Sequence, residues 1–221
     1  MTTIKDRKRL RLESGLPDSV SARVYNCIIG ALVLYGFAMN ALFVDLFSDK
    51  LVGMENSWIL IIVYLVCVIA GSLITRSSSP VISFLGYNLI VIPIGLLLAV
   101  MLPGYPKSDV LSAIIVTGAV VVGMIAFATL KPDFFAKLGR VLFLSLILGA
   151  VCEVIAVLLG YGGNLFNWLF VIIFSLYLGY DWHRAQVYPK TIDNAVDSTV
   201  DIYLDIINIF IRVLSLLNRN D

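Results

Sequence analysis

Apolar residues in this chain occur in long uninterrupted blocks. A bilayer core of about 30 Å requires about 20 apolar residues per helix, with a usable range of about 17–25. Seven blocks meet or approach this length, at residues 24–47, 57–74, 81–102, 110–130, 141–159, 165–180 and 198–217. The pattern therefore predicts an all-α polytopic membrane protein with seven transmembrane helices.

Short polar connectors separate the apolar blocks. They contain Gly and Pro, which end helices, and none of them is long enough to hold a soluble domain. We therefore expect residues 23–221 to form a single seven-helix transmembrane domain. Residues 1–22 are polar and basic, and the apolar block after them is much longer than the ~7–15-residue core of a cleaved signal peptide. They are predicted to form a cytoplasmic N-terminal tail.

Composition supports a membrane protein and narrows the possible chemistry. Apolar residues make up 60% of the chain and charged residues 14%, whereas soluble domains contain about half and about a quarter. A net charge of +1 without a basic domain gives no support for a nucleic-acid partner. The single histidine, His183, argues against a histidine metal centre. No Ser/His/Asp set, HExxH motif or phosphate loop is present, so we expect no enzyme and no cofactor.

The distribution of lysine and arginine predicts the orientation. With the N-terminus in the cytoplasm, 12 of the 16 basic residues fall on the cytoplasmic side, namely Lys5, Arg7, Lys8, Arg9, Arg11, Arg23, Arg76, Lys131, Lys137, Arg140, Arg184 and Lys190. Because cytoplasmic loops are enriched in these residues, this bias favours a cytoplasmic N-terminus. An odd number of helices then places the C-terminus on the opposite side. A re-entrant segment at residues 198–217 would instead return it to the cytoplasm.

Small residues inside the blocks indicate where helices approach closely. Gly30, Gly118 and Gly123 lie within apolar blocks, as do Ser145 and Gly149. Small side chains allow the backbones of transmembrane helices to pack closely, so we expect packing positions here rather than ligand sites.

Four aspartates near the C-terminal end are the most informative polar residues. Asp181 follows the block at residues 165–180. Asp197, Asp201 and Asp205 then occur at intervals of four, which places them on one face of a helix. An ionised Asp at the bilayer centre costs about 2.5–3.5 kcal/mol on insertion scales, so such acids usually face a bundle interior or a watery cavity and handle ions or protons. The pattern predicts an ion pathway.

Two of these acids are the strongest candidates for a functional pair. Asp181 is predicted at the C-terminal end of its helix, where the helix macrodipole disfavours an ionised carboxylate. Asp205 is predicted about two turns inside the seventh helix, by the ~1.5 Å rise per residue. Two carboxyl groups a few ångströms apart cannot both ionise cheaply, so such a pair would share a proton and respond to physiological acidification.

Other polar residues in the blocks are possible additions to the pathway. The polar face of the seventh helix continues with Asn208 and Arg212. For Asp197 and Asp201 the first explanation is exposure to solvent at the cytoplasmic entrance. Glu153 lies in the middle of the block at residues 141–159 and has no basic residue nearby in the sequence. It is predicted to be either a second proton or cation site or a polar contact to another helix.

The C-terminal acids also carry a resemblance to a known family. The string FSLYLGYD, followed 24 residues later by the aspartate of IYLDIINIFIRVL, resembles the C-terminal signature of the Bax inhibitor-1 family, also called the transmembrane Bax inhibitor motif family. The resemblance implies seven helices, six of which surround the C-terminal one. It also implies that Asp181 and Asp205 match paired aspartates that hydrogen-bond to each other and form the pH sensor of a calcium-leak pore.

The same resemblance suggests a latch. Bacterial calcium-leak members of the family have an arginine just past the second helix that binds the aspartate pair when the pore is closed. Arg76, in SLITRSSSP, is the matching candidate. The chain departs from the common family pattern after the first aspartate, where it reads DWHRAQ.

These features predict a pH-sensitive calcium leak channel. Asp181 and Asp205 would sense protons and bind Ca²⁺ weakly, because carboxylate oxygens suit this hard cation, and Arg76 would hold the pore shut. A bacterial plasma membrane is expected, with an endomembrane as the alternative; the oligomeric state stays open. The same acids would also serve a Ca²⁺/H⁺ exchanger. A third alternative is a regulatory protein that binds a membrane protease or a cell-death factor.

Overall fold

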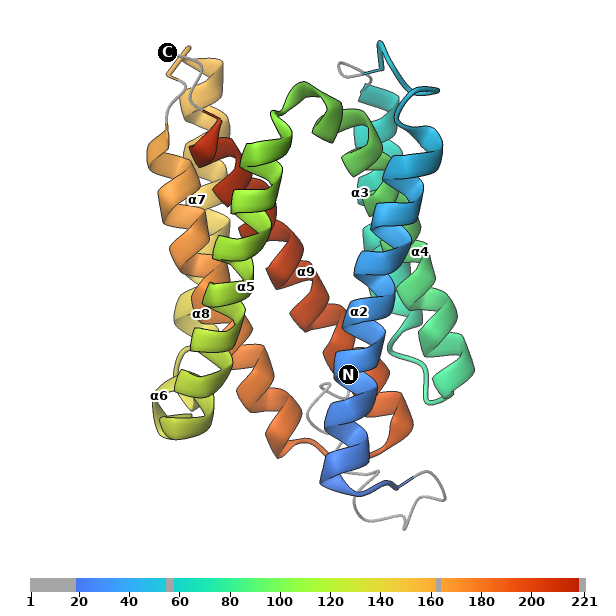
Figure 1. Ribbon diagram of the computed structural model, residues 1–221. Helices are drawn as coiled ribbons and strands as arrows, with labels where there is room; N and C mark the ends of the chain where they lie inside the picture. The colour runs from blue at the N-terminus through green and yellow to red at the C-terminus, as the bar shows by residue number, and fades with distance from the viewer. Residues whose placement is uncertain (1–18, 55–57, 162–163, 219–221) are drawn as a thin grey trace. The chain divides into compact units, whose positions relative to one another are not determined.

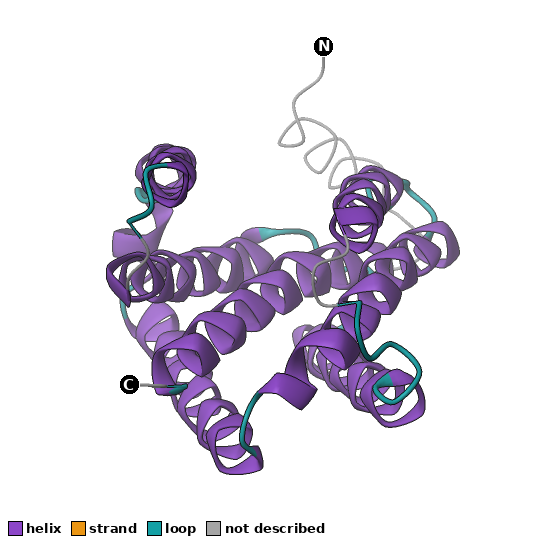
Figure 2. Ribbon diagram, turned by 90° about the horizontal axis from the view of Figure 1, so that it is seen from above, coloured by secondary structure: helices purple, strands orange, loops and turns teal. Residues whose placement is uncertain are grey.

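The computed structural model of the chain describes residues 19–54, 58–161 and 164–218. In this part of the chain the regular structure is helical (Figures 1 and 2), apart from an isolated β-bridge between Ser19 and Thr191. The elements are α2 (Ala22–Phe47), α3 (Trp58–Ile74), α4 (Pro80–Met101), the 3₁₀-helix η1 (Leu102–Gly104), α5 (Lys107–Leu130), α6 (Pro132–Ala136), α7 (Gly139–Leu158), α8 (Asn164–Val187) and α9 (Ile192–Leu217). The predicted all-α fold class is confirmed.

Each of the seven apolar blocks overlaps one long helix. The helices α2, α5, α7 and α8, and α4 together with η1, are long and apolar enough to cross a membrane. The helix α3 contributes a shorter apolar stretch at Ile62–Ile74, and α9 carries Asp197, Asp201 and Asp205. The chain is an integral membrane protein, and α9 runs from Ile192 to Leu217 without the break that a re-entrant segment requires.

The last two helices are longer than their apolar blocks. The helix α8 continues past Tyr180 to Val187, and Pro189 follows shortly after its end. The helix α9 begins six residues before the block at 198–217, because the Thr191 hydroxyl accepts a hydrogen bond from the Asn194 N–H at 3.1 Å and caps the first turn. Asp181 therefore lies well inside α8, and its expected position at the negative end of the helix was wrong.

A short helix lies in a connector for which we expected no helix. The helix α6 begins with Pro132, a favourable first residue, and Asp133 lies in its first turn. Phe135 of α6 is fully buried, and a Cβ atom at Gly179 of α8 would overlap its ring. This contact fixes α6 against α8.

The chain divides into two compact units. The first comprises residues 1–104 and 187–200, and the second comprises residues 105–186 and 201–221. The helix α9 contributes to both.

Residues 1–18 of the predicted tail lie outside the described residues. The Ser21 hydroxyl caps α2 by accepting a hydrogen bond from the Val24 N–H at 3.3 Å.

In the first unit α4 packs against both α2 and α3 (Figure 1). A Cβ atom at Gly86 of α4 would lie 2.9 Å from the carbonyl oxygen of Gly71 on α3, so only glycine permits this approach. On the α2 side, the Tyr35 hydroxyl donates to Asn88 Oδ1 at 2.6 Å, and the Tyr87 hydroxyl donates to the Leu32 carbonyl at 2.9 Å.

Most of the glycines that we expected at packing positions have no neighbouring helix close to them. A Cβ atom at Gly30, Gly118 or Gly123 would meet nothing within 4 Å, so that prediction was wrong for these three. Gly149 does face a neighbour, since its Cβ would lie 3.3 Å from Phe170 Cζ. A small side chain permits close packing, but it does not by itself say which face of a helix meets another.

Candidate functional site

The two aspartates predicted to form a pair come together within the second unit. Asp181 projects from α8 and is 7% exposed, and Asp205 projects from α9 and is 6% exposed. The two carboxyl groups lie close enough to interact electrostatically. Within the part of the chain that the structure describes, Oδ2 of Asp205 is buried without a hydrogen-bond partner. A buried carboxylate oxygen of this kind is costly to leave bare, so the geometry favours a proton or a bound cation beside it.

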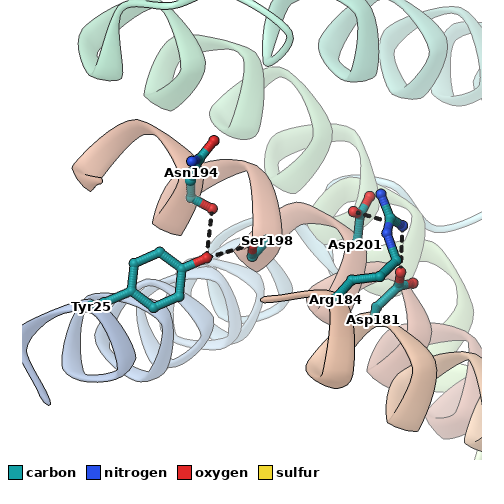
Figure 3. Close-up of polar contacts among 6 residues, drawn as sticks. All are labelled: Tyr25, Asp181, Arg184, Asn194, Ser198 and Asp201. Atoms are coloured by element: carbon teal, nitrogen blue, oxygen red, sulfur yellow. Dashed lines mark hydrogen bonds and ion pairs between the residues drawn. The ribbon is translucent and has the colours of Figure 1, made fainter. Parts of the chain in front are cut away.

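Among the described residues of the second unit, Arg184 is the cation that contacts this pair. Its Nη1 donates to Asp181 Oδ1 at 2.6 Å and lies 3.6 Å from Asp201 Oδ2 (Figure 3). The guanidinium also lies over the Tyr180 ring, 5.4 Å from its centre. From the sequence, Arg184 was expected only to contribute to the orientation. Its spacing of three residues from Asp181 was the available signal, because side chains at i and i+3 meet on a helix.

Arg76, the predicted latch, lies just past the end of α3 and is exposed. Its backbone N–H closes a turn onto the Leu73 carbonyl at 3.2 Å. Arg76 belongs to the first unit and the aspartate pair to the second. The latch therefore stays a prediction.

The other polar residues of α9 differ in their surroundings. The side chain of Asp201 is 43% exposed, in line with its expected position near solvent. Asp197 is half-buried and belongs to the first unit. Asn208 donates to the Leu204 carbonyl at 2.8 Å, one turn back on its own helix.

Glu153 contacts another helix. Arg212 Nη2 donates to Glu153 Oε2 at 2.8 Å, and Nη1 donates to Oε1 of the same carboxylate. The Nη1 group also donates to Asn167 Oδ1 at 3.1 Å, and the guanidinium lies 4.5 Å from the centre of the Phe170 ring. This cluster joins α7, α8 and α9, so of the two interpretations of Glu153 the structure provides the polar contact.

A second buried polar network lies in the first unit, at the beginning of α9. The Tyr25 hydroxyl is 2.9 Å from Ser198 Oγ and donates to the Asn194 carbonyl at 3.2 Å (Figure 3). The Ser83 hydroxyl donates to Asp193 Oδ1 at 2.8 Å. Asp193 was not among the expected residues because it precedes the seventh apolar block. These bonds fix the first turns of α9 to α2 and α4.

The aspartate pair could bind a cation only with help from other ligands. Among the described residues there is no group of three or more His, Cys, Asp or Glu side chains that could hold a metal ion. Ca²⁺ normally takes six to eight oxygen ligands, so an ion at Asp181 and Asp205 would need about four or more further oxygens from water or carbonyl groups.

Comparison with known proteins places the chain in a family. Residues 18–221 match the family described as Bax1-I, inhibitor of apoptosis-promoting Bax1. The chain belongs to the Bax inhibitor-1 family. This confirms the family suggested by the two aspartate motifs, and the match extends over all the helices of the structure.

Individual curated proteins are similar to this chain over part of its length. Uncharacterized proteins from two strains of Helicobacter pylori are 32% identical over 103 residues, which is 44% of this chain and 43% of each relative. A BI1-like protein of Arabidopsis thaliana is 31% identical over 118 residues, or 51% of this chain and 46% of that protein. The chain thus matches less than half the length of these curated relatives. No solved structure matches it.

Proposed function

We propose that this Bax inhibitor-1 family protein is a pH-sensitive leak pathway for Ca²⁺ in which Asp181 and Asp205 sense protons. The observation that supports this most directly is the meeting of two nearly fully buried carboxyl groups from α8 and α9. Buried carboxyls are rare in membrane helices and usually mark ion or proton pathways.

The proton response follows from electrostatic repulsion. Two carboxylates in contact and away from water cannot both be ionised cheaply, so the pair holds a proton until the pH rises far enough to remove it. Acidification therefore neutralises the pair and weakens its attraction for any cationic group that holds α8 and α9 in the closed arrangement. The population of the open state then increases, as expected for a two-state element biased by a local charge.

The choice of Ca²⁺ rests on ligand chemistry and on the family. Carboxylate oxygens are hard ligands, and a site with only two carboxylates releases its ion readily, as conduction requires. A bacterial plasma membrane fits the Helicobacter pylori relatives. Arg76 remains the proposed latch, so its removal should raise Ca²⁺ flux at neutral pH.

The test is Ca²⁺ flux into liposomes that contain the purified protein, measured between about pH 5 and 8, the range in which physiological switches titrate. The wild type should conduct more at acidic pH. Asp205→Asn and Asp181→Asn should lose the pH response, whereas Asp133→Asn, which removes an exposed carboxylate on α6, should retain it. An unchanged titration curve in Asp205→Asn contradicts the proposed sensor. Arg76→Gln, measured in the same assay, tests the latch separately.

The same preparation distinguishes a leak from a Ca²⁺/H⁺ exchanger. An exchanger would accumulate Ca²⁺ against its gradient when a proton gradient is imposed. A leak would only dissipate the Ca²⁺ gradient, whatever the proton gradient. Uphill accumulation would replace the leak with the exchanger while keeping the same two aspartates.

A further inference from the structure

Four charged groups gather where α8 meets the part of α9 that belongs to the second unit, and only one of the four is basic. Arg184 contacts Asp181, lies near Asp201, and interacts electrostatically with Asp205. The proposed function uses Asp181 and Asp205 but gives no role to Arg184 or to Asp201. Because three carboxyl groups surround one guanidinium, the position of that guanidinium decides which carboxyl group is stabilised in its ionised form.

The distances show how the guanidinium is shared. Nη1 of Arg184 is 2.6 Å from Asp181 Oδ1 and 3.6 Å from Asp201 Oδ2. The first distance is that of a short, charge-assisted hydrogen bond, and the second is a longer ion-pair contact. The side chain of Asp181 is 8% exposed and that of Asp201 is 43% exposed. Arg184 therefore stands between a buried acid and an acid that water can reach.

This arrangement distinguishes the two members of the aspartate pair. A carboxylate that accepts a charge-assisted hydrogen bond from arginine is stabilised in its ionised form. Asp181 has such a bond, whereas Oδ2 of Asp205 is buried with no partner among the described residues. The shared proton is thus more stable on Asp205.

The other titratable groups close to the pair do not change this assignment. Tyr177 and Tyr180 of α8 interact electrostatically with one another, and Tyr177 also interacts with Asp181, Asp205 and Arg184. A phenol is neutral near pH 7, so Tyr177 supplies no competing charge. On α9 the charged groups that interact with the pair are Asp201 and the pair's own Asp205.

We propose that Arg184 is the built-in counter-ion of the aspartate pair: it holds Asp181 ionised, leaves the exchangeable proton to Asp205, and passes to Asp201 when the pair becomes fully protonated. This rests on the proposed function, because it describes how the same sensor is set. Protonation of Asp181 removes the negative charge of the carboxylate 2.6 Å from Arg184. The guanidinium then binds the carboxylate of Asp201, which lies 3.6 Å away. The exposed Asp201 thereby couples the buried pair to the aqueous side.

The experiment measures protonation directly as well as flux. Infrared spectra of the purified full-length protein, recorded as a pH titration, report the carbonyl band of protonated carboxyl groups, and Asp205→Asn identifies the component that belongs to the pair. Arg184→Gln should raise the midpoint of this titration by about one to three pH units, the usual effect of an adjacent arginine. Arg184→Lys should recover part of the difference, because it keeps the charge without the planar fork. Arg140→Gln, which removes an exposed arginine at the start of α7, is the control and should leave the midpoint unchanged.

Asp201→Asn provides a second variant at a more exposed position. Removing its charge and its competition for Arg184 should lower the midpoint, opposite to the effect of Arg184→Gln. Equal midpoints in the wild type and in either Arg184→Gln or Asp201→Asn would overturn the counter-ion role.

Failures of the two proposals are distinguishable. If the infrared midpoint moves as expected but no preparation conducts Ca²⁺, the leak is wrong and the counter-ion stands. If the wild type conducts with a pH response that Asp205→Asn abolishes, but Arg184→Gln leaves the midpoints of the infrared titration and of the flux titration unchanged, the sensor stands and the counter-ion role is wrong.

Discussion

The ion pair between Glu153 and Arg212 gives the sharpest prediction about stability. The guanidinium donates two hydrogen bonds to the carboxylate and a third to Asn167, and it stacks on Phe170. The variants that test it are Glu153→Gln and Arg212→Met, together with the double variant. Each single change removes one charge and approximately preserves side-chain length.

The expected loss of stability depends on the number of bonds and on exposure. Hydrogen bonds to charged groups contribute about 1.5–3 kcal/mol each, and breaking a fully buried pair costs about 3–5 kcal/mol. Glu153 and Arg212 have side chains 26% and 24% exposed, so water can partly solvate the charge that is left. We expect each single variant to lower the free energy of unfolding by about 2 kcal/mol, with a coupling energy of about 1–2 kcal/mol in the double-mutant cycle.

Equilibrium unfolding in mixed micelles at neutral pH measures the two single losses and the coupling energy. A coupling energy near zero would contradict the stabilising role of this ion pair.

Two further predictions concern packing and buried hydrogen bonds in the first unit. Gly86→Ala should destabilise the protein by about 1–3 kcal/mol, because the new Cβ meets the Gly71 backbone, whereas Gly30→Ala should be neutral or stabilise by up to about 1 kcal/mol; similar unfolding midpoints for the two variants would argue against the close approach of α3 and α4. Tyr25→Phe should cost about 1–2 kcal/mol through the lost hydroxyl contacts with α9, and Tyr161→Phe, at a side chain 73% exposed, is the control whose thermal unfolding should match the wild type.

The helices themselves were predictable, but their ends were not. Each apolar block corresponds to a helix because burial in a bilayer depends on local composition. Residues 181–187 extend α8 and residues 192–197 begin α9, although both stretches are polar. Polarity ends an apolar block, whereas a helix ends where capping or proline ends it. The seven residues added to α8 moved Asp181 inward and brought Arg184 into the last turn.

The candidate site was predicted in part. The spacing of the aspartates and the family motif predicted that Asp181 and Asp205 form a pair, and the folded chain brings these two residues together in one unit; their role as a sensor stays a prediction. Neither Arg184 as their neighbour nor Arg212 as the partner of Glu153 was expected. The latter two residues are 59 positions apart, and nothing in local spacing connects them.

Local sequence is sufficient to establish a helical membrane protein with acids placed where a bilayer disfavours them, because the free energy of transferring a segment into lipid is nearly the sum of its own residues. Packing between helices was needed to establish which glycines touch a neighbour, which arginine neutralises which acid, and which carboxylate oxygen has no partner. Those outcomes depend on the rotation of each helix about its axis and on the helix that packs against it. Neighbouring positions on a helix point about 100° apart, so a small change in rotation exchanges one set of partners for another.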